Sequence, residues 1–145
     1  MFYNKNNNKR TQIGGNRMIL EERIKQLNAK NTAMERPYVV YWMQSSQRAE
    51  YNHALEYAIR QANRLEKPLV VYFGITDGFP EANERHDSFM LEGLKETKAA
   101  LEQCGIQMLI RKISPEQGAL EISELAALLV VDRGYLRIER QWRAT

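Results

Sequence analysis

Residues 37–73, PYVVYWMQSSQRAEYNHALEYAIRQANRLEKPLVVYF, decide the fold. Their first part, Tyr38–Met43, is an apolar and aromatic run without a charge, which is typical of a strand covered on both faces. Between Gln47 and Glu66, apolar side chains recur at three- and four-residue spacing, so we expect one amphipathic helix there. Leu69–Phe73 then repeats the strand pattern. A strand, a helix and a second strand predict a βαβ unit.

The same alternation continues along the chain of 145 residues, which is the length of one domain. Strands that alternate with helices predict an α/β fold, a Rossmann-like, doubly wound parallel sheet with right-handed crossovers. A Ser-Pro-x-Gln sequence is typical of a helix start. The Ser and Gln side chains can pair with the free backbone N–H groups of the first turn, and Pro has no N–H to leave unpaired. The elements expected here are a helix over Asn83–Cys104 stopped by Gly105, a strand over Ile106–Ile110, a helix from Ser114-Pro115 to about Ala127, and a strand over Leu128–Val131.

Charge separates the start of the chain from the rest. Residues 1–36 hold eight Lys and Arg against three Glu, whereas residues 37–145 hold thirteen basic against fifteen acidic residues. The net charge of +3 therefore belongs to the leader. We expect a disordered tail over 1–16, a helix (residues 17–30) and linker over 17–36, and the α/β domain over 37–145. Four arginines near the end favour a solvated helix face or an internal set of salt bridges over phosphate contact: Arg133, Arg137, Arg140 and Arg143.

The sequence excludes several classes of protein. One cysteine, Cys104, cannot form an internal disulfide, so we expect a reduced, cytoplasmic setting. The longest apolar runs are much shorter than the ~20 residues that cross a bilayer. Glycine-rich phosphate loops, zinc-protease and nucleophile-elbow motifs are absent, and His53 and His86 have no second ligand at metal spacing. We therefore expect no metal site, and we assign Trp42 to the core.

Gly93 lies inside the helix expected over Asn83–Cys104, where it costs about 1 kcal/mol relative to alanine. Close packing of this helix on the sheet would offset that cost. We therefore predict that Gly93 faces the sheet.

Open α/β sheets bind ligands at the carboxyl ends of their strands, where the strand order reverses. The turns after the first, second and fourth strands are therefore the candidate crevice. Helix capping explains the serines after the first strand equally well, and a turn or cap explains Asp132. Arg48 and Asn52, at the start of the helix expected over Gln47–Glu66, suit ligand binding and internal bracing equally. The candidate ligand-binding residues are Met43, Gln44, Ser45, Arg48, Asn52, Phe73, Asp77 and Asp132.

Three segments resemble the N-terminal domain of class II cyclobutane-pyrimidine-dimer photolyases. The first is Val39–Leu55, with its Gln47-Arg48 step and its Asn-x-Ala-Leu helix. The second, Ala82–Leu94, contains Arg85 and a Phe-Met-Leu-x-Gly-Leu pattern, and the third runs from Val131-Asp132 to Arg140-Gln141-Trp142. Many members carry Ser-Arg-Asp where this chain has Gln44-Ser45-Ser46, so any ligand that used the Arg-Asp pair is in doubt here.

The resemblance implies a part of a light-dependent DNA repair lyase that uses reduced FAD. The family binds FAD and the damaged DNA in a helical C-terminal domain, to which no segment of this chain corresponds. The α/β domain packs on that domain and in some members holds an antenna pigment such as a deazaflavin, here in the candidate crevice. We expect no catalysis by this chain alone, and a fifth strand of the family's sheet to be missing. The alternatives are a free-standing nucleotide-binding or regulatory module and a cryptochrome-like light sensor.

Overall fold

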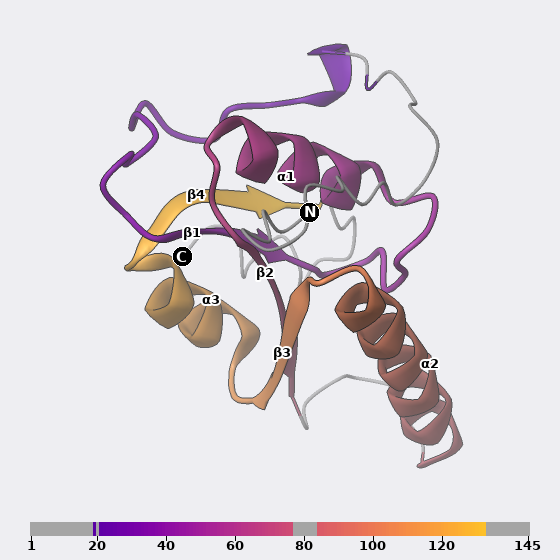
Figure 1. The fold of residues 1–145 in the computed structure, drawn as a ribbon. Coiled ribbons are helices and arrows are strands. Elements are labelled where there is room, and N and C mark those ends of the chain that lie inside the picture. The colour runs from indigo at the N-terminus through magenta and orange to yellow at the C-terminus, as the bar shows by residue number, and fades with distance from the viewer. Residues whose placement is uncertain (1–18, 20, 77–83, 133–145) are drawn as a thin grey trace.

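A four-stranded, all-parallel sheet with helices on both faces forms the centre of the molecule (Figure 1). The computed structural model describes residues 19, 21–76 and 84–132, with the backbone alone for 84–87. The sheet order is β3-β2-β1-β4, which confirms the doubly wound α/β fold. In chain order the elements are β1 (Tyr38–Trp42), α1 (His53–Arg64), β2 (Leu69–Ile75), α2 (Glu84–Gln103), β3 (Gln107–Lys112), α3 (Pro115–Ser123) and β4 (Ala126–Val131).

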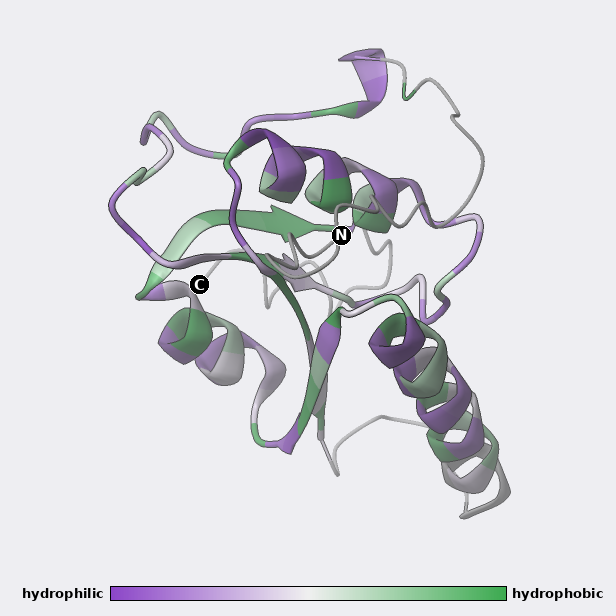
Figure 2. Cartoon of the chain, viewed as in Figure 1, coloured by the Kyte–Doolittle hydropathy of each residue, from purple (hydrophilic) through white to green (hydrophobic). Residues whose placement is uncertain are grey.

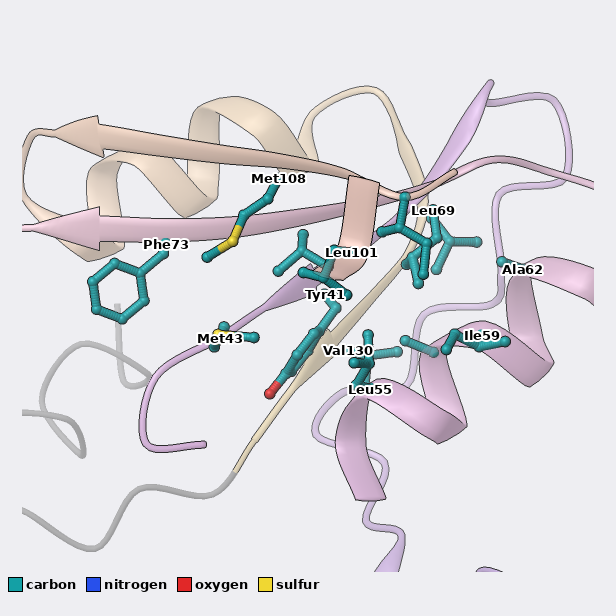
Figure 3. Close-up of a cluster of buried hydrophobic side chains, with 14 of the residues drawn as sticks. Tyr41, Met43, Leu55, Ile59, Ala62, Leu69, Phe73, Leu101, Met108 and Val130 are labelled. Atoms are coloured by element: carbon teal, nitrogen blue, oxygen red, sulfur yellow. The ribbon is translucent and has the colours of Figure 1, made fainter. Parts of the chain in front are cut away.

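Alternate side chains of β1 fill two cores on opposite faces of the sheet. Val39 and Tyr41 belong to the larger cluster, which α1 and α2 cover (Figure 3). Val40 and Trp42 point to the other face, where α3 packs, and this confirms Trp42 as a core residue. The hydropathy colouring agrees, since β4 is largely hydrophobic and α1 carries both hydrophilic and hydrophobic residues (Figure 2). Burial on both faces explains why β1 contains no charged residue.

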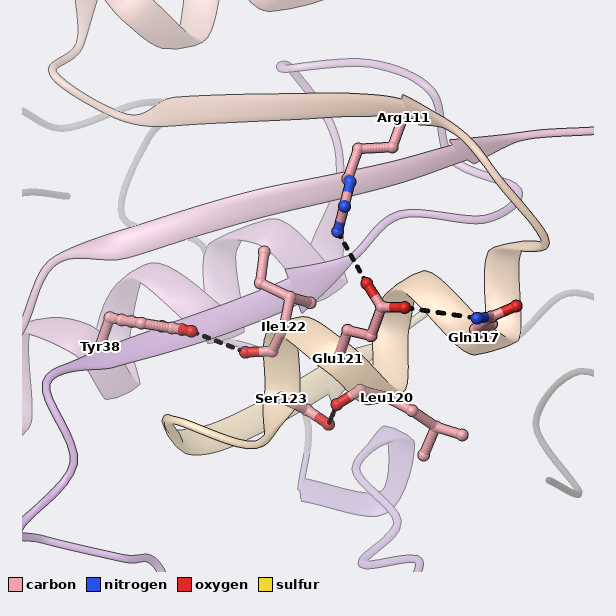
Figure 4. A network of polar contacts seen from close by, with 7 residues as sticks. All are labelled: Tyr38, Arg111, Gln117, Leu120, Glu121, Ile122 and Ser123. Carbon is pink, nitrogen blue, oxygen red and sulfur yellow. Dashed lines mark hydrogen bonds and ion pairs between the residues drawn. The ribbon is translucent and has the colours of Figure 1, made fainter.

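Polar contacts also fasten α3 to the sheet (Figure 4). The Tyr38 hydroxyl donates to the carbonyl of Ile122 at 2.8 Å. The Arg111 guanidinium of β3 donates to the Glu121 carboxylate at 3.1 Å, and the Gln117 amide reaches the other oxygen of Glu121 at 3.4 Å. Because Arg111 and Glu121 are both about half exposed, their ion pair adds at most ~1 kcal/mol of stability.

Two glycines make room for the buried Tyr72 ring under α3. A Cβ atom on Gly118 would lie 2.6 Å from Tyr72 Cζ, and one on Gly74 would lie 2.8 Å from the Tyr72 hydroxyl oxygen. The same hydroxyl has no hydrogen-bond partner among the described residues, and burial raises its pKa. Close approach, and not backbone conformation, therefore accounts for both glycines.

The N-terminal segment differs from the expected helix. Within the described part of residues 17–30, one 3-10 turn, η1 (Glu21–Arg23), is present, and no other helix or strand precedes β1. Of the four apolar residues whose spacing prompts the prediction, Met18 lies outside the described residues, Ile19 is buried, and Ile24 and Leu27 are exposed. A short helix is marginal in water unless its apolar face packs on the protein, and Ile24 and Leu27 do not.

The first long helix, α1, begins at His53 and not near Gln47 as expected. Tyr51 has a φ of 54°, in the left-handed region, which a right-handed helix cannot continue through. Tyr51 is also exposed, so it does not belong to the apolar stripe. Residues 43–52 are consequently a loop. The stripe of α1 that is buried consists of Leu55, Ala58, Ile59 and Ala62.

Other helix details also differ from the expectation. Gly93 is exposed and a Cβ atom there would meet no atom within 4 Å, so the prediction of close packing is wrong. Ser114 occupies the N-cap position of α3, but its hydroxyl makes no capping hydrogen bond. The helix ends at Ser123, because Ala126 already pairs with β1 as the first residue of β4. Gly105 follows α2 with a φ of 76°, as the stop signal predicts.

None of the helices in the described ranges is long and apolar enough to span a bilayer.

Candidate functional site

The strand order reverses at β1. β2 and β3 follow one another on one side of it, and β4 returns to the other side. Trp42, the last residue of β1, is in register with Val131, the last residue of β4. The residues that follow these two strands therefore begin next to each other, at the place where open α/β sheets bind ligands.

Asp132, directly after β4, connects the end of that strand to the loop after β1. One oxygen of its carboxylate accepts a hydrogen bond from the Gln44 amide at 2.7 Å, and the other accepts from the amides of Ser45 and Ser46 at 2.8 and 2.7 Å. The residue is 6% exposed, and burial raises its pKa although the three amides oppose that shift. A carboxylate that receives three amide hydrogens holds the end of β4 against the loop after β1.

Asn52 holds the other end of the same loop. Its side-chain oxygen accepts from the Leu55 amide at 3.0 Å and so caps α1. Its side-chain nitrogen lies 2.9 Å from the Ser46 carbonyl, 3.1 Å from the Arg48 carbonyl and 3.0 Å from the Tyr41 hydroxyl. The Asn52 side chain is buried, and all of these contacts are internal, so they favour bracing over ligand contact for this residue.

Tyr41 reaches this network from β1. Burial raises the pKa of its phenol, the nearby Asp132 charge raises it further, and the hydrogen bond with Asn52 acts in the opposite direction. The hydroxyl is therefore neutral at physiological pH and serves as a hydrogen-bonding group. A tyrosine in the middle of an apolar strand is normally assigned to the core, and only the Asn52 contact indicates its second role.

Thr97 ties α2 to the same loop. Its hydroxyl lies 3.2 Å from the Gln47 carbonyl and 2.9 Å from the Gly93 carbonyl one turn earlier in the helix. Thr97 is a buried polar residue on the inner side of α2, next to the buried Leu94 and Leu101. A threonine at an otherwise apolar helix position is the one sequence signal that could have indicated this contact.

The candidate crevice residues fall into separate groups. Gln44, Ser45 and Asp132 are brought together, and Asn52 is linked to them through Ser46. Met43 and Phe73 are 1% and 6% exposed and belong to the larger hydrophobic core (Figure 3). The side chains of Ser45 and Arg48 are exposed, and Asp77 lies outside the described residues, as do the four arginines near the end of the chain.

Comparison with known proteins identifies the family to which this arrangement belongs. Residues 39–145 match the family model of DNA photolyases. The chain belongs to the DNA photolyase family. A deoxyribodipyrimidine photo-lyase of Methanothermobacter thermautotrophicus is 50% identical over 125 residues, 86% of this chain and 28% of that protein. Enzymes of the same name from Arabidopsis thaliana and Potorous tridactylus are 45% and 42% identical over 58 and 64 residues, 40% and 44% of this chain and 12% of each relative.

The chain thus spans about a quarter of the length of the archaeal photolyase that it matches. In the described part of the chain, no three His, Cys, Asp or Glu residues are grouped as metal ligands. Three side chains at this end of the sheet form hydrogen bonds with main-chain atoms of the loop after β1: those of Asp132, Asn52 and Thr97. The loop is therefore a preorganised rim at the carboxyl ends of β1 and β4.

Proposed function

We propose that this chain is the N-terminal α/β part of a class II photolyase that uses light and reduced FAD to split cyclobutane pyrimidine dimers. The 50% identity over 125 residues to an archaeal deoxyribodipyrimidine photo-lyase is the observation that carries the proposal. Identity at half of the positions, over most of the chain, supports the same packing in both proteins and the same role within a larger protein. FAD and damaged DNA are bound by the remainder of that protein, and this chain alone is catalytically silent.

A chimera tests this role. The corresponding N-terminal part of the Methanothermobacter thermautotrophicus enzyme is replaced with this chain, and light-dependent repair of a dimer-containing oligonucleotide is measured. We expect repair by the chimera and none by this chain alone, with or without added FAD. A chimera that folds and binds FAD but repairs no dimers in light contradicts the proposal, and so does repair by the isolated chain.

The outer face of α2 is the surface that we propose for packing on the FAD domain. Phe89 is 78% exposed, and Gly93, one turn later on the same side of the helix, has open space around it. Exposing the Phe89 ring to water is unfavourable, and the space around Gly93 one turn later would let an apolar partner pack closely against the helix. In the chimera, Phe89→Ser should weaken the coupling between the two parts, seen as separate unfolding transitions. Leu120→Ser, at another exposed apolar position, on α3, is the control and should leave a single transition.

The rim at the ends of β1 and β4 is the place that we propose for an antenna pigment. Ser45 and Arg48 offer exposed polar side chains there. Met43 and Phe73 are already buried in the core, so these two residues supply no open apolar wall beside the polar rim. Binding of a deazaflavin is measured by its fluorescence with the chimera. Ser45→Arg should abolish it, whereas Glu66→Arg, exposed and remote in sequence, should not.

A free-standing nucleotide-binding module is the less favoured function. Such a module would need backbone donors for phosphate in the turn after β1, and three amides of that turn donate to Asp132. A light sensor of the same family shares this domain, and the repair assay on the chimera distinguishes it from an enzyme.

A further inference from the structure

Three consecutive backbone amides after β1 converge on one point. The N–H groups of Gln44, Ser45 and Ser46 donate to the two oxygens of Asp132 over 2.7–2.8 Å. Successive amides that face the same concavity form a nest, an arrangement that binds anions. This nest is a loop structure and not a helix terminus, because α1 begins only at His53.

We propose that the Asp132 carboxylate is a built-in anion that fills this nest and excludes phosphate from the turn after β1. In open α/β sheets, the first turn at the point of strand-order reversal is where ligand phosphates bind. Here a side chain from the neighbouring strand takes the same place and is almost fully buried. The inference goes beyond the proposed function, because it concerns this turn and holds whether or not the parent protein repairs DNA.

The chemistry of the nest explains the exclusion. A phosphate that entered would have to displace the carboxylate from three short hydrogen bonds and then remain beside its negative charge in a poorly hydrated site. Both steps oppose binding. Asp132 is thus a specificity residue of the crevice, which admits a phosphate-free ligand, or one whose phosphate lies away from this turn.

Two substitutions separate a filled nest from an empty one. Asp132→Ala removes the carboxylate and leaves three amides without an acceptor, whereas Asp132→Asn removes the charge but keeps the space filled. Thermal unfolding of the full chain is measured with inorganic phosphate and with sodium chloride at equal ionic strength. Phosphate at about ten times its Kd should favour the folded alanine variant about tenfold and raise its Tm by about 4 °C. The wild-type and asparagine proteins should show no increase beyond that in chloride.

Amide resonances of residues 44–46 locate the effect. In a phosphate titration followed by NMR, they should move in Asp132→Ala and stay unchanged in the wild type. The proposal is overturned if the wild-type resonances respond, if Asp132→Asn responds as strongly as Asp132→Ala, or if the folded alanine variant gains nothing from phosphate. If the alanine variant does not fold, the wild-type titration decides alone, since a response overturns the proposal and its absence supports it. A failure of the chimera to repair DNA would leave these results unaffected.

Discussion

Replacing Asn52 with alanine removes the side chain that joins α1, β1 and the loop between them. The loss of the N-cap bond to Leu55 costs about 1 kcal/mol. The buried Tyr41 hydroxyl also loses its partner, which costs about 1–3 kcal/mol more. The carbonyls of Ser46 and Arg48 add little, because these two residues lie at the surface, where water replaces the amide. We expect the free energy of unfolding to fall by about 2–4 kcal/mol.

Urea denaturation followed by circular dichroism measures this loss. With an m-value near 2 kcal/mol/M, the midpoint should fall by about 1–2 M. Tyr41→Phe is the matched background, because it removes the hydroxyl that Asn52→Ala would leave without a partner. In that background, Asn52→Ala should cost only the cap, about 1 kcal/mol, so the two substitutions should be coupled by the remainder. An equal cost of Asn52→Ala in both backgrounds would refute the reasoning, since the Tyr41 contact would then contribute nothing.

Three further predictions concern single positions. Gly118→Ala should destabilise the fold by about 1–3 kcal/mol in chemical denaturation, because its Cβ collides with the Tyr72 ring, and Tyr72→Phe should restore part of that loss. Gly93→Ala should stabilise the isolated chain by about 1 kcal/mol, because the position is exposed and uncrowded, and a loss of stability would contradict this account. Asp132 should make stability fall as pH rises from its ordinary pKa of 3.8 through the higher pKa of the folded state, because the folded chain binds this proton more tightly. Relative to Asp132→Asn, the wild type should lose stability as pH rises across that range, and a relative gain in the free energy of unfolding would contradict the prediction.

The layered fold could be predicted because burial acts on whole segments. Four apolar runs and the helices between them are enough to specify strands covered on both faces, and their centres agree with the structure to within a few residues. The boundaries depended on single residues. The spacing of Tyr51 fits the α1 stripe, but its left-handed φ prevents the helix from extending back to it, and spacing carries no information about φ. The sequence predicts that the helix from Ser114-Pro115 runs to about Ala127, but it ends earlier because Ala126 pairs with β1.

The sequence predicts which turns lie together at the candidate site, but not what their side chains contact. Parallel topology brings the ends of β1 and β4 together, and the amides of Gln44 and Ser45 donate to Asp132 there, whereas ligand binding at this place stays a prediction. Whether a side chain there faces a ligand or the protein's own backbone depends on loop geometry over distances of 3 Å. Met43 and Phe73 were expected at the crevice because they end strands, yet alternation along the strand directs both into the core.

The lack of glycine in the turn after β1 and the aspartate after β4 are two aspects of one arrangement. Dinucleotide-binding folds place glycines in this turn so that backbone amides can approach a ligand's phosphate. Here the amides of Gln44, Ser45 and Ser46 donate to the carboxylate of Asp132. Because this carboxylate is at the end of a side chain, it can reach the amides without glycine in the turn. Side chains are then tolerated throughout the turn. A missing glycine motif therefore indicates, in this chain, a turn whose anion is supplied internally, and the aspartate that supplies it is the residue whose removal should make the turn bind phosphate.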